Sequence, residues 1–271
     1  MTGLAGAGSA AALAAVACGL VGALVPARIA RIPEPRPQAP RATEPDAVPQ
    51  EASEPAESSG TAETSQLVED PAEEPRPRFV DVAARPGLAL RTSITAAGAG
   101  AVVGGAVGWD WPLLFLLPTV PVGVLLGYVD LRTKLLPSRV LLPAHALVIV
   151  LAGVCALAAA DGHAFLRALL GMVAARSVFW VLWFIRSAGM GFGDVRLSAL
   201  LGFELAYLGW GELVVGTYAS FLIFGLPGLA LAVARRDRSL LRTAFPFGPA
   251  MLAGALVGLV AGPAIWGHLV G

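Results

Sequence analysis

The feature that most constrains this chain is a series of long apolar runs. A helix that crosses a bilayer needs about 20 mostly apolar residues, and about 17 can suffice. Eight segments of the 271-residue chain approach or exceed that length. They are Leu4–Val25, Ser93–Trp109, Pro112–Val129, Val140–Ala160, Phe165–Ile185, Val195–Gly209, Leu213–Ala234 and Pro249–Val270. We therefore predict an all-α, polytopic membrane protein with about eight transmembrane helices, of which the second and sixth are the weakest cases.

The stretch between the first two apolar segments has a different composition. Of the 19 acidic residues in the chain, 11 lie between Glu34 and Glu74, among many Pro, Ala and Ser residues. Such a stretch cannot bury enough apolar surface to fold. We therefore predict three regions: an N-terminal transmembrane helix at 1–32, a disordered acidic cytoplasmic tether at 33–84, and a seven-helix membrane domain at 85–271.

Lys and Arg gather in alternate loops. Short cytoplasmic loops of membrane proteins are enriched in these residues. Arg28 and Arg31 follow the first apolar segment, and Arg132, Lys134 and Arg139 follow the third. The turns after the second, fourth and sixth segments carry acidic residues and neither Lys nor Arg. This asymmetry predicts a multi-pass protein of the plasma membrane, or cell inner membrane, with both chain termini outside.

Two acidic residues, Asp130 and Asp194, fall at the predicted inner ends of helices. Ionisable groups at such a depth are costly and usually functional. A structural role stays open for each: Asp194 is a good helix N-cap, and Asp130 is placed to pair with Arg132 or Lys134. Asp130, however, ends its helix at the C-terminus, where the helix dipole disfavours a negative charge.

A pair of carboxyls would account for both positions. Two close carboxyls share a proton; the ionised one takes a proton from water, and the protonated one polarises a carbonyl. The helix ends assign Asp194 as the base and Asp130 as the acid. Gly191 and Gly193 beside Asp194 allow another backbone to approach. Arg196 either holds Asp194 ionised or marks the inner membrane surface.

Other charged and metal-ligating residues suggest little chemistry. Glu204 lies in the middle of the short sixth segment, where it either pairs with Arg176 or lines a cavity. The two cysteines, Cys18 and Cys155, sit in apolar runs without a CxxC partner, so we expect no zinc site. The chain has no basic domain, so we expect no nucleic-acid partner.

Three segments together resemble the type IV prepilin peptidase (leader peptidase) family of GxGD membrane aspartic proteases. Gly-Phe-Gly-Asp-Val-Arg-Leu at 191–197 resembles the GxGD motif with a basic residue after it. Asp130 is followed seven residues later by Pro137, which is similar to the segment around the first catalytic aspartate of that family. Pro246-Phe247-Gly248-Pro249 is similar to a motif that opens the last helix.

The resemblance implies an aspartic endopeptidase with Asp130 and Asp194 as the catalytic pair. It would cleave the leader peptide from type IV, or tight-adherence type, prepilin-like precursors at the cytoplasmic membrane face, with membrane lipid as its surroundings. Substrate binding or loop shaping would fall to six residues: Gly191, Gly193, Arg196, Pro246, Phe247 and Gly248. Many family members carry two CxxC pairs after the first helix and also methylate the new N-terminus. Those cysteines are missing here, so we expect neither N-methyltransferase activity nor S-adenosylmethionine, and no other cofactor.

Two other functions stay open from the sequence. A transporter would also suit eight helices with charged residues and Gly-rich breaks, and its mark would be an inverted repeat, of which we find no clear case. A non-enzymatic assembly factor for a pilus or a secretion machine would need neither aspartate, and both are present.

Overall fold

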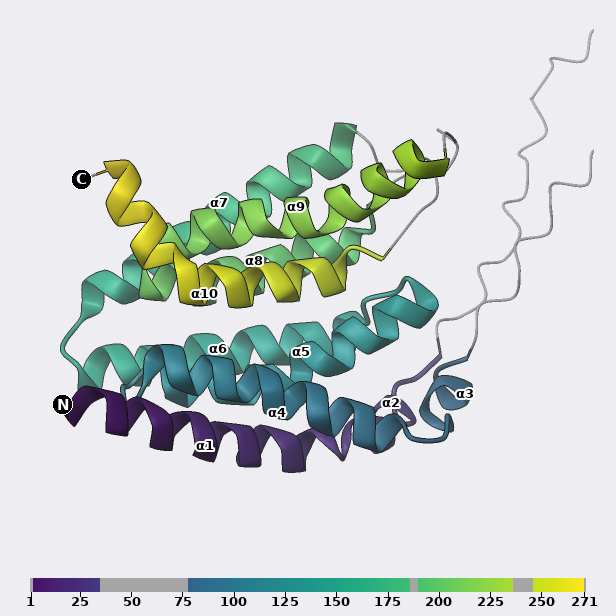
Figure 1. The fold of residues 1–271 in the computed structure, drawn as a ribbon, viewed down its shortest axis with the longest axis horizontal. Coiled ribbons are helices and arrows are strands. Elements are labelled where there is room, and N and C mark those ends of the chain that lie inside the picture. The colour runs from purple at the N-terminus through teal and green to yellow at the C-terminus, as the bar shows by residue number, and fades with distance from the viewer. Residues whose placement is uncertain (1, 35–77, 186–189, 236–245, 271) are drawn as a thin grey trace, which may run out of the picture. The chain divides into compact units, whose positions relative to one another are not determined.

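The computed structural model describes residues 2–34, 78–185, 190–235 and 246–270, and within these ranges all regular secondary structure is helical (Figure 1). The apolar segments give α1 (Thr2–Gly22), α4 (Leu88–Val107), α5 (Leu113–Thr133), α6 (Ser138–Ala158), α7 (Gly162–Ile185), α8 (Phe192–Leu208), α9 (Trp210–Arg235) and α10 (Gly248–Val270). Two short helices, α2 (Val25–Ile29) and α3 (Phe79–Ala83), complete the described part. The predicted all-α fold is confirmed.

Six of the described helices are long and apolar enough to cross a membrane: α4, α5, α6, α7, α10 and the Trp210–Pro227 part of α9. The second predicted span, one of the two weak cases, belongs to this group as Leu88–Val107. The first contributes a shorter apolar helix, Gly6–Gly22, and the sixth forms α8, which has 17 residues. The chain is thus a multi-pass membrane protein. The side of the membrane on which its termini lie stays a prediction.

The tether predicted at 33–84 falls mostly outside the described residues. The structure describes the chain again from Arg78, and α3 at Phe79–Ala83 precedes the domain start predicted at residue 85. Met1–Ile32 and Pro77–Gly271 form one compact unit, so α1 packs in the same unit as the other long helices. The division of function between the three predicted regions stays a prediction.

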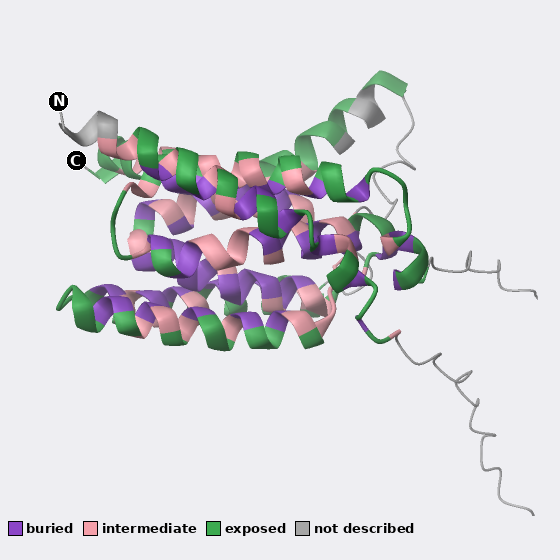
Figure 2. Cartoon of the chain, turned by 90° about the horizontal axis from the view of Figure 1, so that it is seen from below, coloured by how far each residue is buried: buried purple, intermediate pink, exposed green. Residues whose placement is uncertain are grey.

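The helices of this unit lie in two groups, with α1, α4, α5 and α6 on one side and α7 to α10 on the other (Figure 1). The closest pairings are α1 with α4, α7 with α8 and α9 with α10, and α10 also contacts α4 and α5 of the other group. Buried residues lie where helices face one another, and exposed residues cover the outward faces (Figure 2). Many of the exposed residues are large and apolar, among them Ile94, Val150 and Phe184. Such a surface suits lipid rather than water.

Small residues bring α1 and α4 together. A Cβ on Gly100 would lie 2.6 Å from the carbonyl oxygen of Ala14, and a Cβ on Gly104 would lie 2.5 Å from that of Ala10. Small residues at four-residue spacing let membrane helices approach closely, and Gly100 and Gly104 provide such a pair on α4. The third glycine in the series, Gly108, differs: it ends α4 with φ 69°, and nothing lies within 4 Å of its Cβ position.

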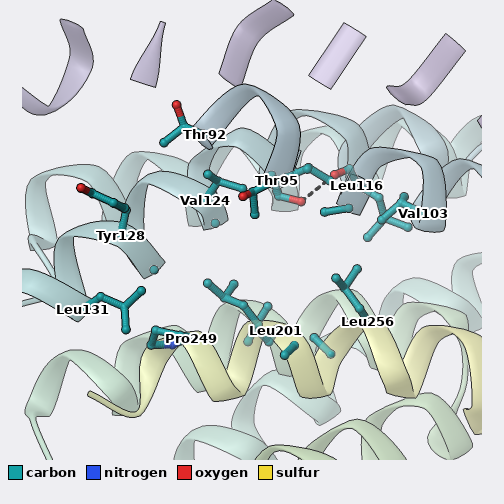
Figure 3. Close-up of a pocket in the computed structure, with 18 of the residues that line it drawn as sticks. Thr92, Thr95, Val103, Leu116, Val124, Tyr128, Leu131, Leu201, Pro249 and Leu256 are labelled. Carbon is teal, nitrogen blue, oxygen red and sulfur yellow. Dashed lines mark hydrogen bonds between the residues drawn. The ribbon is translucent and has the colours of Figure 1, made fainter. Parts of the chain in front are cut away.

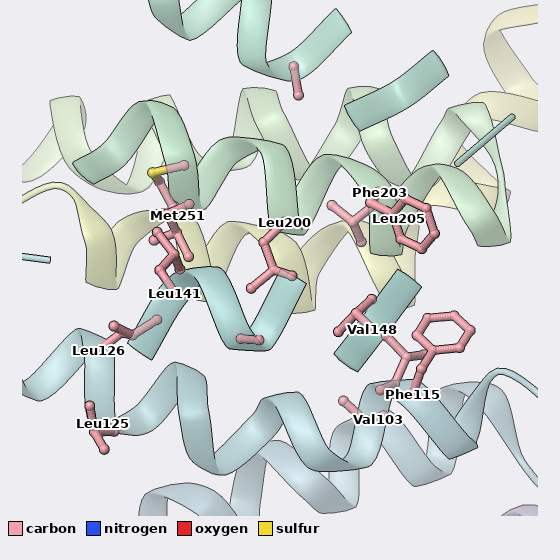
Figure 4. Close-up of a cluster of buried hydrophobic side chains, with 14 of the residues drawn as sticks. Val103, Phe115, Leu125, Leu126, Leu141, Val148, Leu200, Phe203, Leu205 and Met251 are labelled. Atoms are coloured by element: carbon pink, nitrogen blue, oxygen red, sulfur yellow. The ribbon is translucent and has the colours of Figure 1, made fainter. Parts of the chain in front are cut away.

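The helices that carry the two aspartates, α5 and α8, are enclosed more than the others. Twelve of the 17 residues of α8 are buried. A hydrophobic core joins the two groups of helices, and Figure 4 shows Leu126 of α5 and Leu141 of α6 near Met251 of α10. This shared core fixes the ends of α5, α8 and α10 relative to one another, and the candidate site lies at those ends.

Candidate active site

Asp130 occupies the last turn of α5 and is only 4% exposed. Its Oδ2 accepts a hydrogen bond of 2.9 Å from the backbone N–H of Gly248, the first residue of α10. The first N–H groups of a helix have no partner inside it, so Asp130 satisfies one of them in α10. The positive end of the α10 dipole therefore faces Asp130 and offsets the negative end of its own helix.

Asp194 occupies the first turn of α8 and is 6% exposed. Its Oδ2 accepts a hydrogen bond of 3.1 Å from the N–H of Gly191, the N-cap residue. This is the contact by which an acidic residue at the third helical position stabilises a helix start. The other oxygen, Oδ1, is buried and has no hydrogen-bond partner among the described residues. Asp194 thus has a structural contact and a free acceptor oxygen at the same time.

The structure brings these two carboxyls to the same end of the unit. Asp130 lies in the last turn of α5 and Asp194 in the first turn of α8, and Leu136, six residues after Asp130, lies against Gly193, the neighbour of Asp194, although 64 positions separate the two acids in the sequence. Each carboxyl has one oxygen fixed by a backbone N–H. The second oxygen of each carboxyl takes no part in these two backbone contacts.

Gly193 and Gly248 occupy positions where a side chain would disturb this end. A Cβ on Gly248 would lie 2.8 Å from Oδ2 of Asp130. A Cβ on Gly193 would lie 2.6 Å from the Cβ of Leu136, in the loop that leads into α6. The group that approaches Gly193 is therefore the side chain of Leu136 of this chain. Gly191 is exposed, and a Cβ there would make only ordinary contacts.

Arg196 does not pair with Asp194 in the described part of the chain. Its guanidinium donates a hydrogen bond to Ser138 Oγ at the start of α6, and it lies over the ring of Phe192 at 5.0 Å from the centroid. Arg196 therefore joins the starts of α6 and α8. Its contacts hold the α8 end beside the start of α6.

Phe247 anchors the start of α10. It is 4% exposed and packs against Phe224 of α9, with ring centroids 4.8 Å apart, and against Phe221 and Phe179 at 5.4 and 5.9 Å. Pro246, half-buried, precedes it. This aromatic cluster holds the Gly248 N–H against Asp130. Sequence reasoning missed the cluster because its members come from three helices.

Glu204 is the third buried carboxyl of the unit, at 5% exposure. It forms a hydrogen bond with the side chain of Thr119, and its Oε1 has no partner among the described residues. Ten residues of helix separate it from Asp194, or about 15 Å. Of the two alternatives for Glu204, the pairing with Arg176 is not found among the described residues, and Arg176 is exposed on α7.

Arg167 has a role that the sequence does not reveal. Its guanidinium donates hydrogen bonds to the carbonyl oxygens of Ala206, Tyr207 and Leu208, at 2.6, 2.6 and 3.1 Å. The last carbonyls of a helix lack partners within it, so Arg167 caps the C-terminal end of α8 from the neighbouring helix α7. A basic residue inside an apolar segment was the only signal for this.

Cys18 and Cys155 are both buried and free. Across the described residues, no group of three or more His, Cys, Asp or Glu side chains is arranged to hold a metal ion. The absence of a zinc site, of S-adenosylmethionine and of a nucleic-acid partner stays a prediction.

Comparison with known proteins places the two carboxyls in a matched segment. Residues 119–233 match the type IV leader peptidase family. The chain is 31% identical to the prepilin leader peptidase/N-methyltransferase of Aeromonas hydrophila over 164 residues, covering 59% of this chain and 53% of the relative. For the proteins of the same name from Pseudomonas putida and Neisseria gonorrhoeae, identity is 31% and 30%, over 61% and 59% of this chain and 54% and 52% of theirs. The chain spans about half the length of these curated relatives. No solved structure matches the chain significantly.

Proposed function

Residues 119–233 belong to the type IV leader peptidase family, and from this premise we propose that the chain is an aspartic endopeptidase that removes the leader peptide from prepilin-like precursors. The observation that carries the proposal is the pair of buried carboxyls, Asp130 and Asp194, at adjoining helix ends inside the matched segment. The substrate class comes from the relatives, which are named prepilin leader peptidases.

In the proposed reaction, the pair holds one proton between its two carboxyls. The ionised carboxyl takes a proton from water as the water oxygen bonds to the scissile carbonyl carbon, and the protonated carboxyl donates a hydrogen bond to the carbonyl oxygen. When the C–N bond breaks, a proton passes from the pair of carboxyls to the leaving amine nitrogen. The free Oδ1 of Asp194 suits the oxygen that meets the water.

We revise the roles of acid and base that the helix ends predict for Asp130 and Asp194. That prediction made Asp130 the acid because α5 ends there and its dipole disfavours an anion. The N-terminus of α10 also faces Asp130, through the Gly248 N–H, and favours an anion. We therefore assign the shared proton to the pair and not to one residue.

The proposed site faces the cytoplasm. Basic side chains gather at the helix ends where the two carboxyls lie, since Arg28, Arg132, Lys134 and Arg139 are exposed in or beside the ends of α2, α5 and α6. Lys and Arg favour the cytoplasmic side of a membrane. The proposal covers the peptidase reaction alone and includes neither N-methylation, nor a cofactor, nor zinc.

Cleavage of a membrane-anchored prepilin precursor by the purified protein in detergent tests the proposal. We expect the wild type to remove the leader and the Asp130→Asn and Asp194→Asn variants to lose this activity while keeping their helical circular dichroism. Asp110→Asn serves as the matched control, because Asp110 is exposed in the turn between α4 and α5, at the other end of α5. Cleavage that survives both substitutions would contradict the assignment of the carboxyls.

A further inference from the structure

Arg176 is a charged residue deep inside a membrane-spanning helix. It belongs to α7, fourteen residues after the first residue, Gly162, and nine residues before the last, Ile185. It is exposed, and no hydrogen bond, ion pair or ring contact joins it to another residue of the described ranges. A cation within an apolar span is costly, and such residues usually have a partner or a function. The structure therefore leaves a costly charge on the outside of the protein without a compensating group.

Both ends of α7 are distant from Arg176. At 1.5 Å per residue, Ile185 lies about 14 Å away along the helix axis and Gly162 about 21 Å away. Long basic side chains near the end of a span can reach the membrane surface. Side chains on a helix lean toward its N-terminus, however, and for Arg176 this is the direction of the farther end. The position of Arg176 thus disfavours contact with water at either surface.

Other arginines of the spanning helices have partners or lie at helix ends. Arg167 donates hydrogen bonds to three carbonyl groups at the end of α8. Arg132, in the last turn of α5, lies over the ring of Tyr128 at 5.6 Å from the centroid. Arg91 lies in the first turn of α4, at the edge of a mostly apolar groove of about 330 Å³ between α4, α5, α8 and α10 (Figure 3). Arg176 differs from these three in combining depth, exposure and the lack of a partner.

A stripe of exposed side chains runs along α7 beside Arg176. Its members follow one another at intervals of four and three residues, and we call them the α7 stripe: Leu166, Leu170, Val173, Ser177, Trp180 and Phe184. This is the spacing of the a and d positions by which two helices pack side by side. Arg176 holds the adjoining g position, from which charged side chains pair with a partner helix. The buried residues of α7, such as Ala168 and Gly171, lie on another face, and α7 packs closely against α8.

The charge of Arg176 indicates what kind of helix fits the α7 stripe. A second copy of this chain would have to supply an exposed carboxyl at the same depth. In the described long helices, Asp130, Asp194 and Glu204 are buried. The remaining acid of these helices, Glu212, lies in the first turn of α9. A helix of a different membrane protein, with an acidic residue inside its apolar stretch, complements both the stripe and the charge.

We propose that the α7 stripe binds a transmembrane helix of a second membrane protein, and that an acidic side chain of this helix pairs with Arg176. The stripe would supply the apolar contact between the two helices. The ion pair would set their relative depth, because the interaction of two charges is strong in a medium of low dielectric constant. Asp130 and Asp194 lie on other helices, so this inference does not rest on the proposed function.

Binding of synthetic helices to the full-length protein in phosphatidylcholine vesicles tests the proposal. Two labelled peptides of about 20 Leu and Ala residues differ only in one central residue, which is Glu or Gln. Energy transfer from the labelled protein measures their association. We expect the Glu peptide to bind at least about threefold more tightly than the Gln peptide, as for a polar contact between membrane helices. Arg176→Gln should remove this preference, whereas Arg91→Gln, the matched control, should keep it.

Equal binding of the two peptides to the wild type would overturn the proposal, as would a preference that survives Arg176→Gln. Loss of the preference when phosphatidylglycerol is added to the vesicles would also overturn it, because a lipid phosphate would then be the partner of Arg176. Energy transfer between labelled copies of the chain that Val173→Trp abolishes would show that a second copy occupies the stripe, and would overturn it too.

Thermal unfolding of the protein without peptide gives a readout that does not depend on binding. Arg176→Met removes the charge and keeps an unbranched side chain. We expect the Tm of this variant in the same vesicles to equal or exceed that of the wild type, since Arg176 has no partner in the described part of the chain. A lower Tm would show that Arg176 stabilises this chain by itself, which would overturn the proposal.

Discussion

Asp194 and Glu204 lie on the same helix, are buried to nearly the same extent, and each has one oxygen without a partner among the described residues. Their surroundings differ. Asp194 accepts a backbone N–H from its own helix start and is exposed to the charge of Asp130. Glu204 has the Thr119 hydroxyl and no second carboxyl within the described surroundings. Burial alone therefore does not distinguish the two carboxyls, and the helix end is what favours Asp194 for the proposed catalytic role.

The largest expected effect comes from removing a carboxyl of the pair. Asp194→Asn keeps the size of the side chain and removes its ability to take a proton. We expect cleavage to fall by about 10²–10⁴-fold, the usual contribution of general acid–base catalysis. Single-turnover cleavage of the precursor measures this. A loss of cleavage smaller than about tenfold would indicate that Asp194, like Glu204, has a structural role.

Gly248→Ala should have the next largest effect. The added Cβ would lie 2.8 Å from Oδ2 of Asp130, so the hydrogen bond from the Gly248 N–H would lengthen or break. A hydrogen bond to a charged group contributes about 1.5–3 kcal/mol, so kcat should fall about ten- to hundredfold. Gly98→Ala is the matched control, since nothing lies within 4 Å of its Cβ position. Equal activity of the two variants would show that this bond does not position Asp130.

Arg167→Met should act on stability more than on cleavage. The methionine fills a similar volume but leaves three carbonyl groups at the end of α8 without donors. Buried polar groups without partners cost about 1–3 kcal/mol each, so the Tm in detergent should fall clearly. We expect cleavage at low temperature to fall less than it does in Gly248→Ala. An unchanged Tm would mean that water replaces the guanidinium at no cost.

The smallest effect is expected for Glu204→Gln. The amide keeps the shape and the bond to Thr119, and it removes a group that is costly to bury as an anion. We expect cleavage within about twofold of wild type, an equal or higher Tm, and a pH–rate profile with both limbs at the wild-type positions. A lost or displaced limb would show that Glu204 titrates with the catalytic pair, which would remove the contrast with Asp194.

Much of this fold could be predicted from the sequence because a long apolar run marks each of the long helices. Close packing of α4 against a neighbouring helix was also predictable, since its glycines are periodic, but the sequence did not identify α1 as that neighbour. Of the two weak cases, the segment around Gly100 is long and apolar enough to span, and the sixth segment forms the short helix α8.

The candidate site was predictable in its residues and less so in its electrostatics. Asp130 and Asp194 stand out because acids are rare in the apolar segments. The sequence could not show that α10 begins beside Asp130, because this depends on packing between residues 118 positions apart. The same holds for Phe247 and Arg167, whose partners come from other helices. Contacts of this kind depend on tertiary structure and produce no periodic pattern in the sequence.

The shortness of α8 has a consequence for the lipid around the protein. Its 17 residues rise about 25 Å, whereas the hydrocarbon core of a bilayer is about 30 Å thick. Its neighbours α7 and α9, with 24 and 26 residues, have no such deficit. Asp194, in the first turn of α8, would then lie below the headgroup level, between longer helices. Longer acyl chains would place it deeper and lengthen the path of a peptide to the carboxyls, so the thickness of the host membrane would affect the rate of the proposed cleavage.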